Sequence, residues 1–81
     1  MQPASDIIAR KLGESAVLIR MRTSRIYELN ATGARIWELL KQHTSRDTVI
    51  EALLEEFHIE RHDAEAAVDE LLETLRSEGL I

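Results

Sequence analysis

The chain turns from strand to helix within Leu29-Asn30-Ala31-Thr32-Gly33-Ala34-Arg35-Ile36-Trp37-Glu38-Leu39-Leu40, and this short segment sets its architecture. Just before it, residues 25–29 alternate polar and apolar side chains, as a half-buried strand does. From Gly33 onward, small and apolar residues recur at the i, i+3, i+4 and i+7 spacing of one helix face. Asn30 and Thr32 are residues that can accept hydrogen bonds from the free N–H groups of a first helical turn. The sequence therefore predicts a strand held against a helix by a very short corner.

Around this corner, three strand patterns are followed by three helix patterns. The strand patterns occupy residues 7–10, 15–21 and 25–29. The helix patterns occupy about residues 31–42, 46–57 and 61–78. Thr44 and Asp47 have the spacing of a capping box for the second helix, and Gly79 is a typical residue just after a helix end. The order predicts an α+β fold, a three-stranded antiparallel sheet followed by three helices, with one domain at residues 6–81 and a flexible tail at 1–5.

The composition excludes several classes of protein. The 81 residues include no cysteine, so no disulfide, thiolate zinc site or thiol nucleophile is available. The net charge of −5 disfavours nonspecific binding to nucleic acid or to anionic lipid. The first residues lack a signal-peptide pattern, and no apolar run approaches the roughly 20 residues that span a bilayer. We therefore expect a cytoplasmic protein without a membrane partner.

The histidines give no pattern of a catalytic or metal site. His43, His58 and His62 are the only ones, and none lies beside a plausible nucleophile; Ser45, near His43, is better explained by a helix start. His58 and His62 are four residues apart, but the His-Glu-x-x-His pattern of zinc proteases is missing. We expect no catalytic residue, no metal and no cofactor, and hence no enzyme.

A nucleic-acid-binding winged helix is the alternative function, because it also combines short strands with three helices. The helix at 61–78 has two basic residues against six acidic ones, and the helix at 46–57 has one against four. Neither helix could approach a phosphate backbone without repulsion. The basic residues gather in the N-terminal half, so a basic wing keeps this alternative open. We expect no nucleic-acid partner.

The strand at 25–29 would lie at the edge of the meander, with one side of its backbone unpaired. An extended peptide can add to such an edge as a further strand. Arg25 and Glu28 could equally discourage strand pairing, and physical reasoning alone leaves both interpretations open. The edge could also pair with its own copy, so the chain is expected to be a monomer or a weak or strand-swapped homodimer.

The segment Tyr27-x-Leu29-Asn30-x-Thr32-Gly33-Ala34-x-Ile36-Trp37-x-Leu39-Leu40 resembles the core signature of the PqqD-like family, the RiPP recognition elements. The likeness covers about residues 6–81 and continues through Thr48-Val49-Ile50-Glu51-Ala52-Leu53, Ala67-Val68-Asp69-Glu70-Leu71-Leu72 and Leu75-Arg76-x-x-Gly79-Leu80. The resemblance is closer to free-standing members of lasso-peptide pathways, and to unassigned relatives, than to the pyrroloquinoline quinone pathway protein.

The resemblance implies a winged helix-turn-helix-like fold and a peptide-chaperone function in natural-product biosynthesis. Members bind the leader segment of a ribosomally made precursor peptide and present it to a modifying enzyme. That enzyme would be a leader peptidase in a lasso pathway and a radical enzyme in the quinone pathway. The sequence names neither the precursor nor the enzyme nor the product.

The resemblance also implies where the leader binds: it adds against the third strand and lies beside the third helix. The implied edge residues are Arg25, Ile26, Tyr27, Glu28 and Leu29, and the implied helix wall is Val68, Asp69, Leu72, Glu73 and Arg76. We expect Tyr27 and Leu29 to pack inward against a core residue, Trp37, and Ile26 to lie nearer the cleft. The corner itself is expected to be scaffold. Acidic Asp69 and Glu73 suggest a leader of basic or amphipathic character.

Overall fold

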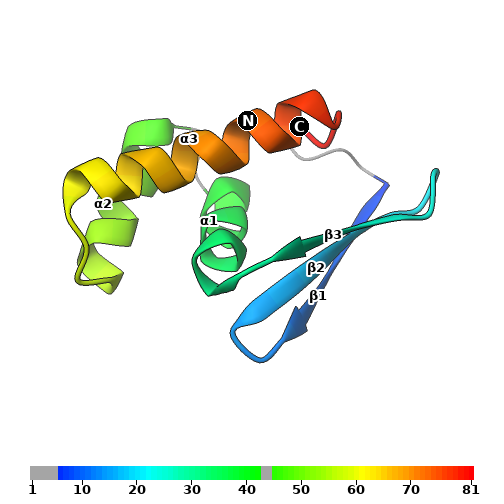
Figure 1. The fold of residues 1–81 in the computed structure, drawn as a ribbon, viewed down its shortest axis with the longest axis horizontal. Coiled ribbons are helices and arrows are strands. Elements are labelled where there is room, and N and C mark those ends of the chain that lie inside the picture. The colour runs from blue at the N-terminus through cyan, green and yellow to red at the C-terminus, as the bar shows by residue number, and fades with distance from the viewer. Residues whose placement is uncertain (1–5, 43–44) are drawn as a thin grey trace.

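The computed structural model describes residues 6–42 and 45–81. Its elements are β1 (Ile7–Leu12), β2 (Ser15–Arg20), β3 (Arg25–Leu29), α1 (Ala31–Gln42), α2 (Arg46–Glu56) and α3 (Arg61–Ser77). The three strands form a sheet on one side of the molecule and the three helices form a layer on the other (Figure 1). The predicted α+β fold and the order of its elements are confirmed.

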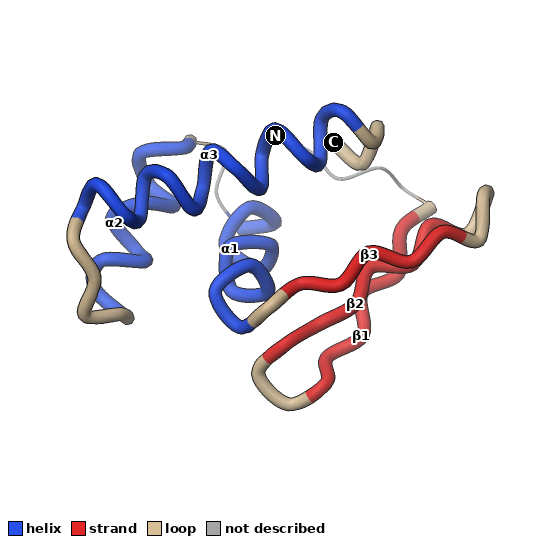
Figure 2. The backbone as a smooth tube through the Cα atoms, in the orientation of Figure 1, coloured by secondary structure: helices blue, strands red, loops and turns tan. Residues whose placement is uncertain are grey.

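The sheet is an antiparallel meander in the order β1-β2-β3, so β2 is central and β3 lies at an edge (Figure 2). β1 is longer than predicted because the tight turn at Gly13, with φ of 64°, leaves Leu12 paired with Ser15. In β2, Ala16 and Leu18 are buried under the helices. Since side chains alternate along a strand, the neighbours of Leu18 point to the opposite face of the sheet.

The predicted corner between β3 and α1 is confirmed in detail. The Gly33 N–H donates to Asn30 Oδ1 at 2.8 Å, and the Ala34 N–H donates to the Asn30 carbonyl at 2.7 Å. A Cβ at Gly33 would lie 3.2 Å from Asn30 Oδ1 and 3.6 Å from Leu29 Cβ. A side chain at this position would therefore press on the cap and on the end of β3, which explains the glycine.

The N-terminal cap of α2 differs from the predicted capping box. Ser45 is the cap residue, and its side chain accepts from the Thr48 N–H at 3.5 Å. Its extended backbone, with φ −108° and ψ 133°, places the hydroxyl over the third N–H of the helix. Thr44 lies outside the described residues, and α2 begins one residue after Ser45.

The C-terminus of α3 is closed by a Schellman motif, as Gly79 predicts. The Leu80 N–H donates to the Leu75 carbonyl at 2.7 Å, and the Gly79 N–H donates to the Arg76 carbonyl at 3.1 Å. Gly79 has φ of 71°, a left-handed conformation that favours glycine. Arg20 of β2 donates from Nη1 to the Glu78 carbonyl at 2.9 Å, which ties this helix end to the sheet.

The core lies between the two layers. α1 packs against the sheet, and α2 and α3 pack mainly on α1 and on each other. Trp37 is only 3% exposed and belongs to the core, as predicted. None of the described helices is long and apolar enough to cross a bilayer.

Candidate functional site

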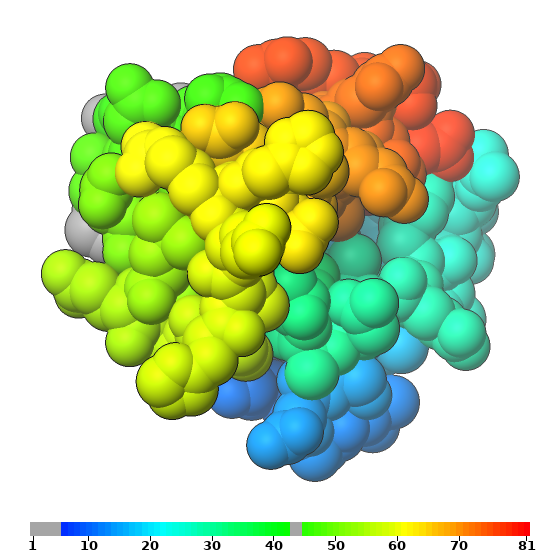
Figure 3. Space-filling model, turned by 60° about the vertical axis from the view of Figure 1, so that its left-hand side comes forward, coloured from blue at the N-terminus to red at the C-terminus, as the bar shows by residue number. Residues whose placement is uncertain are grey.

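A groove of about 360 Å³ lies between β3, the start of α1 and α3. In the space-filling view it is a hollow between α3, drawn in orange, and the corner that joins β3 to α1 (Figure 3). We call it the β3–α3 groove. Its floor consists of buried aliphatic side chains, namely Leu18, Ile36, Leu75 and Leu80. An apolar floor of this kind favours guests with large hydrophobic side chains.

One side of the groove is formed by β3 through Tyr27, Glu28 and Leu29. Tyr27 and Leu29 are half-buried and pack against the core, as predicted, with Ile36 of α1 also lining the groove beside them. The Arg25 guanidinium lies over the Tyr27 ring, 5.7 Å from its centroid. This contact helps to orient the tyrosine at the groove.

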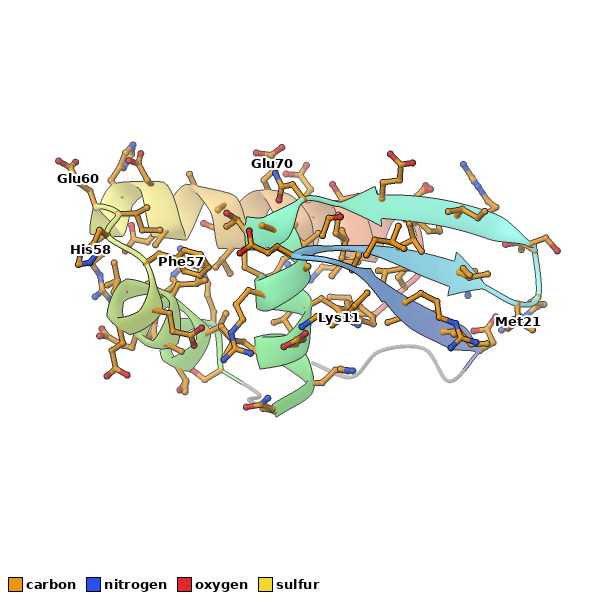
Figure 4. All side chains as sticks on the ribbon, turned by 90° about the horizontal axis from the view of Figure 1, so that it is seen from below. Lys11, Met21, Phe57, His58, Glu60 and Glu70 are labelled. Carbon is orange, nitrogen blue, oxygen red and sulfur yellow. The ribbon has the colours of Figure 1, made fainter. Side chains whose placement is uncertain are left out.

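The other side is formed by α3 through Ala67, Glu70, Leu71 and Thr74. These residues follow the i, i+3, i+4 and i+7 spacing, so they share one helix face. Glu70 projects from α3 beside the start of α1 (Figure 4). Among the described lining residues there is no Lys, Arg or His, so the formal charge of the groove is negative.

The corner completes the groove with Asn30, Thr32 and Gly33. The corner, which we expect to be scaffold, thus also borders the groove. Because only Asn30 separates β3 from α1, the first helical turn itself lies at one end of the groove. The side chains of Asn30 and Thr32 therefore bring polar groups to this end.

The residues expected on β3 are divided between the two faces of the sheet. Tyr27 and Leu29 face the groove, and Arg25 flanks Tyr27, whereas Glu28 borders the groove between them with its side chain on the outer face of the sheet. Ile26 is 64% exposed and is not part of the groove, contrary to our expectation. Since Tyr27 packs inward, the strand alternation turns Ile26 to the outer face.

The residues expected as the helix wall lie outside the β3–α3 groove. Val68 and Leu72 are buried in the core, with exposures of 0% and 2%. Asp69, Glu73 and Arg76 border a different hollow on α3, together with Leu72 and Ser77. The side of α3 that faces the groove consists instead of their sequence neighbours, Ala67, Glu70, Leu71 and Thr74.

Asp69 has a structural partner. Arg46 donates to its two carboxylate oxygens at 2.6 and 2.8 Å, which joins α2 to α3. The hydrogen bonds from Arg46 lower the pKa of the Asp69 carboxyl below its ordinary value. This carboxylate is therefore engaged in helix packing, away from the groove.

One sequence signal could have located the helix wall. α3 carries apolar residues over a wider arc than one core stripe requires: Ala64, Val68 and Leu72 are buried, whereas Ala67 and Leu71 are only half-buried. The second row, one residue out of phase with the first, is the one that lines the groove. A surplus apolar row beside a complete core row indicates a binding surface.

A comparison of the sequence with models of protein families identifies the family of this chain. Residues 15–81 match the family described as coenzyme PQQ synthesis protein D (PqqD). The chain belongs to the PqqD family. A search of curated proteins found no significant match.

Two solved structures share the fold of this PqqD-family protein. One is described as lasso peptide synthetase B1 complexed with the leader peptide; it is 28% identical, with a TM-score of 0.84, and the match covers 98% of this chain and 93% of that one. The other is TbiB1 in complex with the TbiA(beta) leader peptide, at 24% identity and a TM-score of 0.87, covering 99% and 93%. The similarity extends over the sheet and all three helices.

The structure offers no metal site in its described part. In residues 6–42 and 45–81, no three His, Cys, Asp or Glu side chains are grouped closely enough to hold an ion. His58 and His62 lie in the α2–α3 connector and the first turn of α3, both exposed. Their positions favour solvation over metal binding.

Proposed function

We propose that this PqqD-family protein binds the leader segment of a ribosomally synthesised precursor peptide in the β3–α3 groove. The observation that carries the proposal is the position of this groove along the edge of β3, with α3 as its opposite wall. The lasso synthetase B1 structure, which shares the fold, holds a leader peptide, and this supports the same class of ligand here.

The geometry suits strand addition. The outer edge of β3 has no neighbouring strand among the described residues, so a guest backbone can pair with it. Alternate side chains of an extended guest then point toward the apolar floor. Main-chain hydrogen bonds supply affinity, and the floor selects guests with large apolar residues two positions apart.

The other edge of the sheet is less suited to a guest strand. Arg10 and Lys11 stand in the middle of β1, and Lys11 pairs with Glu38 of α1 at 2.9 Å. Charged residues on an edge strand, lysine above all, deter strand pairing. We therefore assign the guest to β3.

We infer that residues 6–81 act as a single adaptor domain that delivers the leader to a modifying enzyme, such as a leader peptidase or a radical enzyme, without catalysis of its own. The nucleic-acid alternative finds no support, because α2 and α3 are both strongly acidic.

The test uses synthetic leader peptides from the precursor gene adjacent to this one, each with one N-methylated backbone amide. In strand addition, only every second amide of the guest donates to β3. We expect methylation at those positions to weaken binding about tenfold or more, and at the intervening positions to change it little. Isothermal titration calorimetry would measure this. Tolerance at every position, or a periodicity of three to four, would contradict strand addition.

The groove charge leads to a second prediction, with Glu70 replacing the expected Asp69 and Glu73. Glu70 is exposed at the groove rim, so it favours a guest that carries a lysine or arginine nearby. We expect Glu70→Lys to weaken leader binding by about three- to tenfold at low salt, and less at high salt because ions screen the interaction.

Glu73→Lys is the matched control. It makes the same charge change on the same helix but borders the other hollow. We expect a clearly smaller loss of affinity than for Glu70→Lys, since Glu73 does not line the β3–α3 groove and a guest in the groove makes no direct contact with it. An equal loss in both variants would show that only the net charge matters.

A further inference from the structure

The outer face of the sheet is apolar and has no helix on it. All three described helices pack on the inner side, where Ala16 and Leu18 are buried (Figure 1). Four of the five exposed large hydrophobic side chains belong to the strands or to a hairpin turn of this sheet, namely Ile8, Leu12, Met21 and Ile26. Such a concentration is unusual for a surface that faces only water.

The strand register arranges this face in cross-strand rows. Ile8 pairs with Ile19, and Ile19 pairs with Ile26, which makes one row of three isoleucines. In the adjacent row, Arg10 pairs with Val17, and Val17 pairs with Glu28. This second row is positive at β1, apolar at β2 and negative at β3.

The second row is complementary to itself. A two-fold axis parallel to β2 places β1 of one copy over β3 of the other. Arg10 then faces the glutamate at position 28 of the other copy, and Ile8 faces the isoleucine at position 26. Among the described residues, neither Arg10 nor Glu28 has an ion-pair partner within the chain. A second copy therefore supplies ion-pair partners for Arg10 and Glu28, and it covers the exposed isoleucine row with the same row of the other copy.

We propose that the outer face of the sheet is a homodimer interface in which two copies pack face to face about this axis. Two sheets pack in this way at about 10 Å with their side chains interdigitated. The contact is isologous, because each copy presents the same patch to the other. It leaves the edge of β3 open, so each copy can still receive a guest strand.

The size of the face sets the strength of the dimer. With a rise of about 3.3 Å per residue and about 4.8 Å between strands, the face measures roughly 20 by 10–15 Å. Two copies therefore bury roughly 400–600 Å² of sheet surface in total, half or less of the roughly 1,200 Å² that specific interfaces bury, so the contact is weak and transient. We expect a dissociation constant on the order of 100 μM, so dimers form only in concentrated solution.

Sedimentation velocity of the full chain, from about 10 μM to 1 mM, tests the association. We expect the sedimentation coefficient to rise from monomer toward dimer. Ile26→Lys should weaken association at least tenfold, because a buried isoleucine is lost and a charge is placed in the row. Ile59→Lys is the control, since Ile59 is 38% exposed in the connector before α3. A wild type that stays monomeric, or an Ile26→Lys variant that still dimerises, would overturn the proposal.

A mixing experiment tests the register. Arg10→Glu alone places glutamate against glutamate across the interface, and Glu28→Arg alone places arginine against arginine. Each variant should therefore be monomeric by itself. An equimolar mixture pairs opposite charges at both contacts and should dimerise again. If the mixture associates no more than the separate variants, this two-fold arrangement is overturned, and circular dichroism establishes that both variants are folded.

Discussion

Replacing Ala67 with tryptophan is expected to abolish leader binding while leaving the fold intact. Ala67 is half-buried on the groove face of α3, and the indole would occupy the space that a guest side chain needs. Each large apolar guest side chain kept out of the groove forfeits about 1.5–3 kcal/mol. Losing two such contacts lowers affinity by at least about 100-fold, which calorimetric titration with the leader peptide would measure.

Ala66→Trp is the matched control for this substitution. Ala66 is the preceding residue, is exposed, and does not line the groove. The same indole on the same helix should leave affinity within about twofold of the wild type, because it points into water. Thermal unfolding followed by circular dichroism should be similar for both variants. Normal binding by Ala67→Trp would place the guest somewhere other than this groove.

Replacing Trp37 with alanine is expected to unfold much of the protein. The side chain is 3% exposed in the core around α1, and such truncations cost about 3–5 kcal/mol. Small domains have a total stability of about 5–15 kcal/mol, and an 81-residue chain belongs near the lower end of that range. Urea denaturation followed by circular dichroism should show a midpoint shifted strongly toward zero.

Trp37→Phe separates a core role from a binding role. The indole N–H of Trp37 has no hydrogen-bond partner among the described atoms, so its loss leaves no group unsatisfied. We expect a stable fold and leader affinity within about twofold of the wild type, because Trp37 does not line the β3–α3 groove. A well-folded Trp37→Phe variant that binds tenfold more weakly would assign the residue to the site.

Local signals explain why the elements could be predicted from the sequence. The Asn30 cap, the Gly79 helix end and the alternation in residues 25–29 each act within a few residues, and all three are as expected. Where two neighbouring residues can both cap a helix, the sequence does not show which of them does so. Thr44 and Ser45 can both cap a helix, and the start of α2 is set by the one whose hydroxyl reaches Thr48.

The candidate site could be predicted only in part. The edge strand follows from the order of the elements, and the sequence places Tyr27 and Leu29 on one face. The side of α3 that faces the groove was expected one residue away from its actual position. The sequence shows a second apolar row on α3, Ala67 with Leu71, beside the row of Val68 with Leu72, and the more strongly apolar row of Val68 and Leu72 fills the core.

The sequence by itself determined the order of strands and helices, the corner at Asn30 and Gly33, and the membership of Trp37 in the core. These depend on periodicity, caps and hydrophobicity, which act locally along the chain. Only the tertiary structure decided that Ala67 and Leu71 face the groove and that Ile26 faces the outside. The reason is physical: α3 packs on α1 and α2 so that Val68 and Leu72 enter the common core, and Ala67 and Leu71 are left half-buried at the groove.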